Sequence, residues 1–537
     1  MHRASPLVRE ALLAAGAAAS LAALLVWLGP PGNDLAAHVY QRAVFLDDGY
    51  ELWNNFWYGG RYSFVTYSVL YYPLAAFFGI EPLAIASIAT AALAFAVVVG
   101  RQWGPLARWS SRTFAVVWAG LIISAAFPFA LGFAFGLLAL WALQAGKHWR
   151  FGVLAVLTLA ASPLAFLLLA ILLAGVAFDL RERGRRLLAP TLIIVAIGAA
   201  QLLLTRAFPD GGRYPFPEWQ LAAVATFCVL GVALTWRVES AHTLRWFFVA
   251  LFAVCFLSYL VPSPVGENVA RIRFVALPIA VLILSLRGWR PIPVSAFALL
   301  LAAAWNLTPH AWSFERGRAE MPAAQAAYWQ PAIEFLNENL TPSYRVEVVD
   351  TAGHWAAVHL PQAGIPLVRG WFRQDDFPQN EVLYEGLNRE SYRRWLHGLG
   401  VQYVVLTDAS TDYSAKHEER LVRSGQSGLE PVYSSERLTI FAVPGARPIV
   451  TGPAPAEVVD VGQGHMLVRL EQPGRYRVAV RHSPYWRADA GCVSRGRDDM
   501  LRLHARRAGL VRLEFRVKAR QALAAVVGAA GAACPRP

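Results

Sequence analysis

Long apolar runs alternate with short connectors up to about residue 308, and a mixed polar and apolar pattern follows them. Eleven of these runs have the length and composition of membrane-spanning helices. The predicted spans are 8–28, 84–100, 113–126, 129–146, 151–162, 164–180, 187–206, 218–236, 244–262, 273–287 and 292–307. The segment 63–78 is apolar but short and aromatic, so we expect a half-buried helix at the membrane surface there rather than a span.

Every second connector is basic, and this pattern predicts the orientation of the chain in the membrane. The basic connectors hold Arg101, Arg108 and Arg112; Lys147 and Arg150; Arg181, Arg183, Arg185 and Arg186; Arg237 and Arg245; and Arg287 and Arg290. The turns at 127–129 and 161–163 carry no charge. Because basic connectors stay in the cytoplasm, we expect a multi-pass protein of the cell membrane with a cytoplasmic N-terminus. An odd number of spans then places everything after Thr308 outside the cytoplasm.

The segment after residue 308 predicts two domains outside the cytoplasm. Residues 325–339 and 391–398 have helical periodicity, and the runs 345–349, 402–406 and 438–443 read as strands of a mixed sheet. From about residue 456 apolar and basic residues alternate, which is typical of a β-sandwich. The expected division is therefore a membrane domain over 1–308 with a first outer loop at 29–83, an α/β domain over 309–447 and a sandwich over 448–537.

Composition refines this division. Only 16% of the residues are charged, against roughly 25% in a soluble protein. Cys228 and Cys255 fall in predicted spans, whereas Cys492 and Cys534 fall outside the cytoplasm, where an oxidising compartment predicts a disulfide.

Residues 448–537 hold 15 Lys plus Arg against 7 Asp plus Glu. This excess indicates either a solvated arginine face or a contact with anionic lipid or wall polymer. No nucleic-acid-binding module is present.

The first outer loop is where we expect the chemistry, because carboxylates on a connector beside the bilayer are costly. Asp34 is either the N-cap of a helix over 35–46 or a catalytic base that removes the proton of an acceptor hydroxyl. His38 lies one helical turn further on and either orients that group or is an ordinary interfacial histidine. Asp47 and Asp48 are adjacent, so on a helix they would point about 100° apart and would not obviously chelate one ion.

Aromatic and basic residues complete the candidate site. Trp53, Trp57 and Tyr58 could stack on sugar rings or belong to the aromatic belt of the membrane surface. Arg271 and Arg273 close the last outer loop, where an arginine fork could bind a lipid phosphate, although snorkelling of long side chains is the alternative. His354 and His359 have no acidic partner that the sequence suggests, and we interpret both as structural.

Several short motifs resemble the GT-C class of membrane glycosyltransferases. They are Asp34-x-x-x-His38, Trp57-Tyr58-Gly59-Gly60, Tyr71-Tyr72-Pro73, Gly266-Glu267-Asn268-Val269-Ala270-Arg271 and Ser483-Pro484-Tyr485-Trp486-Arg487. Arg369-Gly370-Trp371, Asn380 and Tyr403-Val404-Val405-Leu406 are similar to actinobacterial membrane proteins of the same build. The resemblance covers most of the chain through its order of one span, a long acidic outer loop, further spans and outer C-terminal domains.

The resemblance implies an inverting transferase that uses a polyprenyl-phosphate sugar and a cell-envelope glycan or lipid acceptor. Asp34 would be the catalytic residue. The donor phosphate would be bound by Arg271, Arg273, Asn268 and Glu267. The acceptor would be oriented by His38, Asp47, Asp48, Trp57 and Tyr58. No cofactor is implied, and the adjacent aspartates make a metal ion doubtful.

Two other functions remain open on the sequence alone. A transporter of lipid or glycan would need a polar path through the membrane, yet the spans offer few polar residues beyond Ser124, Ser162, Gln201 and Asn306. A non-catalytic protein that binds or assembles wall polymer would need the outer domains but could lose Asp34 without harm.

Overall fold

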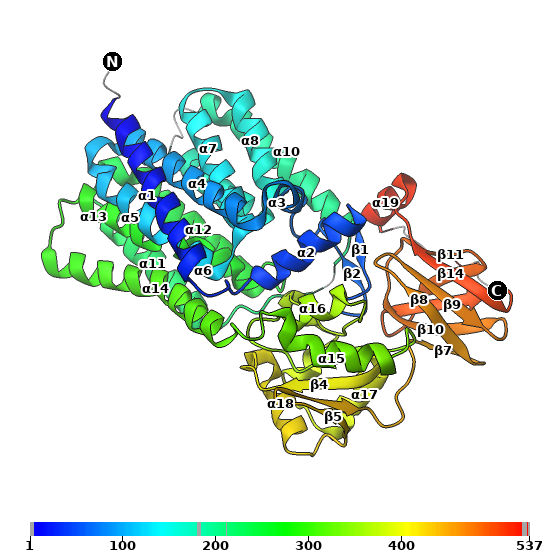
Figure 1. Ribbon diagram of the computed structural model, residues 1–537. Coiled ribbons are helices and arrows are strands. Elements are labelled where there is room, and N and C mark those ends of the chain that lie inside the picture. Colours follow the sequence, from blue (N-terminus) through cyan, green and yellow to red (C-terminus); the bar gives the residue numbers. More distant parts are fainter. Residues whose placement is uncertain (1–4, 180–183, 211, 529–533, 535–537) are drawn as a thin grey trace. The chain divides into compact units, whose positions relative to one another are not determined.

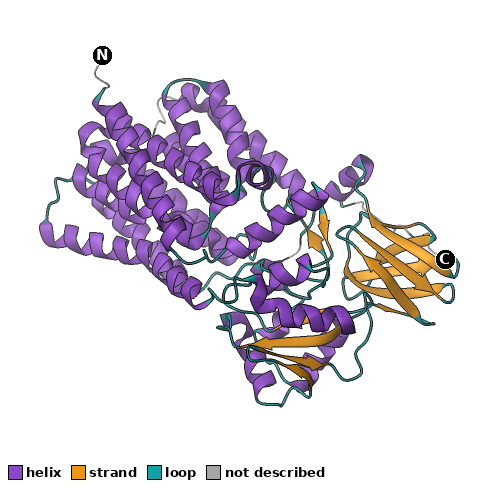
Figure 2. Cartoon of the chain, viewed as in Figure 1, coloured by secondary structure: helices purple, strands orange, loops and turns teal. Residues whose placement is uncertain are grey.

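The computed structural model describes residues 5–179, 184–210, 212–528 and residue 534. The chain forms two compact units (Figure 1). The helical unit comprises residues 1–35, 67–202 and 213–318, and the sheet-bearing unit comprises residues 36–66, 203–212 and 319–537. The helical unit is built of helices, and all the longer strands belong to the sheet-bearing unit (Figure 2). The boundaries of the three expected domains stay a prediction, although residues 36–66 of the first outer loop group with the sheets.

Helices overlap every predicted span, but the span 113–126 is divided between two helices at Gly120 and the span 273–287 begins in the 3-10 helix η4 (Gly266–Val275). The helices of this unit are α1 (Pro6–Leu28), α3 (Tyr71–Phe78), α4 (Ile80–Trp103), α5 (Arg108–Ala119), α6 (Leu121–Ser124), α7 (Phe127–Gln144), α8 (His148–Ala161), α9 (Pro163–Asp179), α10 (Gly184–Ala207), α11 (Glu218–Thr235), α12 (His242–Leu260), α13 (Ala276–Leu286) and α14 (Ile292–Ala319). Within the described ranges, 8 helical stretches are long and apolar enough to cross a membrane, one of them the continuous run Ile80–Ser124, and α8 and α9 are shorter apolar helices. The count of eleven crossings stays a prediction.

The first helix packs closely against its neighbours because the side chains on its buried face are small. Ala11, Ala14, Ala18 and Ala22 recur every three or four residues and are at most 3% exposed. Such a stripe lets helix backbones approach each other in a membrane protein, and α1 packs along α4 and α5. Near the start of α1, Glu10 accepts hydrogen bonds from Arg112 of α5 at 2.9 and 3.1 Å.

The uncharged turns after α6 and α8 lie against the first outer loop at one end of the helical unit. The N–H of Asp34, just after α1, donates to Ser124 O at the end of α6, at 3.1 Å. The N–H groups of Val69 and Leu70 donate to Ala160 O at the end of α8, at 3.1 and 3.0 Å. Gly317, near the end of α14, lies against Pro30 and Pro31, where an added Cβ would stand 2.5 Å from Pro31 O. The first loop and the chain after α14 therefore leave the bundle at the same end.

Hydrogen bonds also connect the basic connectors of the helical unit with one another. Trp103 Nε1 at the end of α4 donates to Ser240 O in the connector before α12, at 2.6 Å. Arg245 donates to Thr235 O and Trp236 O, both at 2.7 Å, and Arg287 donates to Leu234 O at 2.8 Å. The grouping agrees with the alternation of charge in the sequence. Arg181 and Arg183 of the predicted basic connectors lie outside the described residues.

The predicted surface helix over 63–78 is only partly correct. The structure has helix α3 over Tyr71–Phe78 alone, and the residues before it form turns. The N–H of Tyr71, the first residue of the helix, donates to the Ser68 hydroxyl at 3.1 Å. Hydrophobicity by itself did not reveal that local side-chain bond.

The α/β part of the second unit contains a mixed four-stranded sheet. The strand order is β3 (Arg345–Val348), β4 (Val401–Thr407), β6 (Leu438–Ala442) and β5 (Glu430–Ser434), with β3 and β4 parallel and the other pairs antiparallel. Its helices are α15 (Ala326–Asn339), α16 (Ala356–Gln362), α17 (Arg389–Leu399) and α18 (Lys416–Arg423). Asn388 and Ser391 form a capping box that begins α17. The predicted helices and strands are present, and β5 is an additional edge strand.

The sandwich has two four-stranded sheets. One has the order β12 (Gly491–Arg495), β13 (Met500–Ala505), β10 (Gly474–Arg481), β7 (Val450–Thr451) and the other β11 (Trp486–Ala488), β14 (Gly509–Phe515), β9 (His465–Leu470), β8 (Ala456–Val461). Alternate residues of β14 face the core, as the period of two predicts, whereas β10 also buries Ala479 where its pairing with β13 is irregular. The predicted disulfide between Cys492 and Cys534 is confirmed. It joins β12 to a residue that follows the last helix, α19 (Ala519–Val526). Cys228 and Cys255 are buried thiols.

Cysteine labelling tests the orientation. We expect Ala319→Cys, an exposed position at the end of α14, to react with a membrane-impermeant maleimide in intact cells. Ala145→Cys, exposed beside the basic residue Lys147, is the matched control and should react only after lysis. The native cysteines are buried or paired and give a low background. The reverse labelling pattern would invert the topology.

Candidate functional site

Asp34 is fixed by its backbone at the end of the first helix. The N–H groups of Asn33 and Asp34 donate to Ile123 O and Ser124 O, both at 3.1 Å. Gly32 makes this approach possible, because a Cβ there would stand 2.6 Å from both Ala125 Cβ and Ile122 O. Asp34 immediately precedes α2 (Leu35–Asp48), its side chain is half-buried, and Asn33 Nδ2 approaches its Oδ1 at 3.4 Å.

Tyr67 belongs to the same neighbourhood, and the sequence analysis did not select it. Burial raises the pKa of the Tyr67 phenol to about 12, Arg271 opposes the increase and Asp34 adds to it. The phenol therefore experiences both the carboxylate that follows α1 and an arginine that lies more than two hundred residues later. At neutral pH it stays protonated and can donate a hydrogen bond. Its only signal in the sequence was its place in an aromatic loop.

The two candidate arginines lie on a ten-residue 3-10 helix, η4 (Gly266–Val275). Arg271 Nε donates to Asn268 Oδ1 at 3.1 Å, and its guanidinium carbon lies 5.8 Å from the centre of the Phe129 ring. Asn306 of α14 donates to Arg273 O at 2.6 Å and so anchors the end of η4. Arg271 and Arg273 are both half-buried. Within the described ranges, the two terminal nitrogens of Arg271 have no hydrogen-bond partner.

Charges of both signs meet in this part of the helical unit. Arg273 interacts electrostatically with Glu267, Arg271 and Asp34. Asp34, a carboxylate that can accept a proton, thus lies within electrostatic range of Arg273, and both Asp34 and Arg271 act on Tyr67. This arrangement fits general base catalysis beside a departing phosphate, and it contains four of the predicted donor-site residues together with Asp34.

The other predicted site residues lie in the sheet-bearing unit. His38 is fully buried on the first turn of α2, whereas Asp47 and Asp48 are exposed on its last turn. Nine residues of helix separate His38 from Asp47, a rise of roughly 14 Å. Burial and Asp47 raise the pKa of Asp48, and His465 opposes that shift. These residues do not form one cluster.

Trp57 and Tyr58 are buried rather than presented on a surface. Trp57 is 0% exposed, its Nε1 donates to Ala357 O at 2.9 Å, and its ring lies 4.4 Å from that of Tyr40. Tyr58 has a φ of 58° and is 2% exposed, with the Arg481 guanidinium 5.8 Å from its ring centre. Their role as sugar-stacking surfaces stays a prediction, and their burial favours a packing role.

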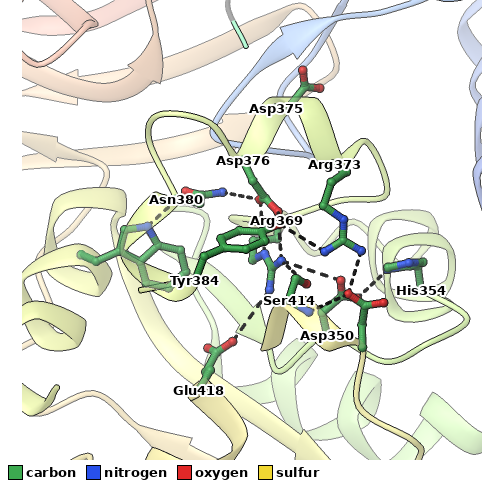
Figure 3. Close-up of polar contacts among 12 residues, drawn as sticks. Asp350, His354, Arg369, Arg373, Asp375, Asp376, Asn380, Tyr384, Ser414 and Glu418 are labelled. Atoms are coloured by element: carbon green, nitrogen blue, oxygen red, sulfur yellow. Dashed lines mark hydrogen bonds and ion pairs between the residues drawn. The ribbon is translucent and has the colours of Figure 1, made fainter. Parts of the chain in front are cut away.

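A buried network of charged residues is the second feature that sequence reasoning missed (Figure 3). Arg369 lies at its centre and is 4% exposed. Its guanidinium donates to Asp376 Oδ2 at 3.0 Å and to Ser414 Oγ at 2.9 Å, and it lies 3.9 Å from carboxylate oxygens of Asp350 and Glu418. Arg373 donates to Asp412 at 2.7 Å, and Asn380 and Tyr384 donate to Asp376 at 2.9 and 2.6 Å.

The network shifts the pKa values of its carboxyl groups in opposite directions. Although burial opposes the effect, Arg369 and Arg373 hold the pKa of Asp376 below its usual value. Burial and the neighbouring Glu418 raise the pKa of Glu347, which belongs to the fully buried strand β3. The sequence signal was an Arg and a Glu inside a short apolar strand. The expectation that His354 lacks an acidic partner is wrong, because its Nδ1 lies 2.8 Å from Asp350 Oδ1.

A second buried ion pair ties the first outer loop to this network. Arg61 of the short strand β2 (Arg61–Tyr62) donates from Nε to Asp375 Oδ2 at 2.6 Å, and both side chains are at most 2% exposed. The N–H of Arg481 on β10 donates to Gly59 O at 2.8 Å. The network therefore stabilises the part of the loop that carries Trp57 and Tyr58. Within the described ranges no three His, Cys, Asp or Glu side chains are arranged to hold a metal ion.

These features define a polytopic membrane protein with a sheet-bearing unit that includes part of its first loop. The sequence matches no known protein family and no curated protein. The mycobacterial arabinofuranosyltransferase AftD is 14% identical, and the match has a TM-score of 0.49 and covers 89% of this chain and 43% of that one. ArnT from Cupriavidus metallidurans is 14% identical, with a TM-score of 0.37 over 78% of this chain and 96% of that one. Both TM-scores are below 0.5, so these likenesses do not identify an activity.

Proposed function

We propose that the protein is a GT-C-type membrane glycosyltransferase that transfers a sugar from a polyprenyl phosphate to a cell-envelope glycan or lipid. The observation that carries the proposal is the common neighbourhood of Asp34, Tyr67, Arg271 and Arg273 at the end of the helical unit where the uncharged turns lie against the first outer loop. A polyprenyl tail would lie among apolar helices, and its phosphate would lie at the level of this end.

Each residue would have a distinct task. The Asp34 carboxylate would accept the proton of the acceptor hydroxyl as its oxygen attacks the anomeric carbon. The bond between that carbon and the phosphate oxygen would break, and Arg271 and Arg273 would stabilise the negative charge left on the phosphate. Asn268 would hold the Arg271 guanidinium in place through the 3.1 Å hydrogen bond. Attack from the face opposite the phosphate would invert the anomeric centre.

The lipid-linked glycans of a deletion strain test the proposal. We expect loss of the protein to cause accumulation of a polyprenyl-phosphate sugar or of an acceptor that lacks one sugar. Wild type should restore the normal pattern and Asp34→Asn should not, at equal protein levels. Full restoration by Asp34→Asn would favour a non-catalytic role in binding or assembling wall polymer.

Replacement of Arg271 tests its contact with the donor. We expect Arg271→Ala to weaken the binding of a polyprenyl phosphate by ~10–100-fold, because a charge-assisted contact is lost. Arg271→Lys should be intermediate, because it keeps the charge but loses the planar fork. Native mass spectrometry of the protein in nanodiscs can measure the binding. Arg101→Ala, an exposed arginine of a basic connector, is the control and should bind as wild type does.

A further inference from the structure

The sheet-bearing unit contains a cavity of about 810 Å³, and five of its eight lining residues have basic side chains. Helix α17 contributes Arg393, Arg394 and His397, β10 contributes Arg477, and Arg447 precedes β7. The lining is completed by Glu390, Gly398 and Thr451. It contains four arginines, one carboxylate and no aromatic ring, so the charged groups of the lining favour an anion as the ligand.

Only two of the four arginines are neutralised by partners. Arg394 donates to Glu390 at 2.7 Å. Arg477 donates to Asp498 and to Gly398 O, both at 2.7 Å. Arg393 and Arg447 are exposed, and in the part of the chain that the structure describes neither has a hydrogen bond or an ion pair. The cavity therefore keeps an excess of positive charge on two guanidinium groups.

These two guanidinium groups and His397 line the same cavity. Its Nε2 lies 3.1 Å from Pro444 O. Burial lowers the pKa of His397, the contact with Pro444 opposes the shift, and both Arg393 and Arg447 lower it further. Side chains from α17 and from the segment before β7 thus act on one imidazole, although more than fifty residues separate them in the sequence. Two guanidinium groups without partners in one cavity can both donate charge-assisted hydrogen bonds to an oxyanion bound there.

We propose that this cavity binds a phosphate group, as a monoester or a diester, through Arg393 and Arg447 with Arg477 and Thr451 at its side. Guanidinium groups match the geometry of phosphate oxygens, and a threonine hydroxyl can donate a further hydrogen bond. The site belongs to the sheet-bearing unit and does not depend on the proposed transferase activity.

Binding of inorganic phosphate to the full-length protein in detergent tests the site. At constant ionic strength, isothermal titration calorimetry should show saturable binding to wild type. The double variant Arg393→Ala/Arg447→Ala should bind at least ~10-fold more weakly, because charge-assisted hydrogen bonds are lost. Arg506→Ala/Arg507→Ala removes the same charge from exposed residues outside the cavity and should bind as wild type does.

Equal weakening by both double variants would reduce the effect to non-specific charge and overturn the proposal, as would absence of saturable binding to wild type. Two competitors then distinguish the source of the phosphate. Displacement by a soluble glycerophosphodiester assigns the site to a phosphodiester polymer. Displacement only by phosphatidylglycerol vesicles, and not by phosphatidylcholine vesicles, assigns it to a lipid headgroup. Displacement by neither restricts the site to monoesters. All these outcomes are independent of Asp34.

Discussion

Asp34→Asn is expected to lower the rate of sugar transfer by roughly 10²–10⁴-fold, the usual contribution of a positioned general base. Asparagine has nearly the same size and can still accept a hydrogen bond at a helix start, but it cannot take the acceptor's proton. The hydrogen bond from the Asp34 N–H to Ser124 O involves the backbone alone, so the substitution leaves it in place. Donor binding should therefore change little while turnover falls.

Two further variants separate catalysis from helix capping. Asp34→Ser retains a capping oxygen without a base and should be about as inactive as Asp34→Asn. Asp48→Asn removes an exposed carboxylate from the far end of α2 and should leave turnover nearly unchanged. Rates can be measured with a radiolabelled donor and protein reconstituted in nanodiscs. Full activity of Asp34→Ser, or loss of folded protein in both Asp34 variants, would reduce this residue to a structural role.

Arg369→Met should destabilise the sheet-bearing unit by ~3–5 kcal/mol, the usual effect of breaking a buried ion pair from one side. Methionine fills part of the space but leaves Asp376 and Glu418 without the cation that lies 3.0 and 3.9 Å from their oxygens. Hydrogen exchange of peptides from β3 and β4 measures this change locally. Arg469→Met breaks an exposed pair of 2.7 Å with Glu457 and should cost at most about 1 kcal/mol.

The loss of unfolding free energy caused by Arg369→Met should become smaller at acid pH. In wild type the pKa of Asp376 is held down, so the stability that it contributes is present above the unfolded-state pKa and is lost as the pH falls through the folded-state pKa. In the variant the unpaired carboxyl groups have raised pKa values and gain stability when they are protonated. A difference between variant and wild type that stays constant from pH 7 to pH 4 would show that lost packing, not charge, is the cause.

The sequence by itself determined the elements of this protein and the pairing of its cysteines. Apolar length predicted each membrane helix, the period of two predicted the sandwich strands, and an oxidising compartment predicted the Cys492–Cys534 disulfide. These properties are readable because each depends on residues close in sequence or on composition. The helix over 63–78 was predicted too long, because residues 63–70 form turns that their apolar character does not reveal.

Only the tertiary structure decided which distant residues meet. Tyr67 joins Asp34 and Arg271 because the chain after α1, the segment before α3 and η4 end at one side of a helical unit. Arg369 contacts carboxylates as far apart in the sequence as Asp350 and Glu418. Arg393 and Arg447, from different elements, line one cavity with His397. Such groupings follow from packing and from burial of charge, and neither has a periodic signature along the chain. Pattern therefore predicts the elements, and packing decides the sites.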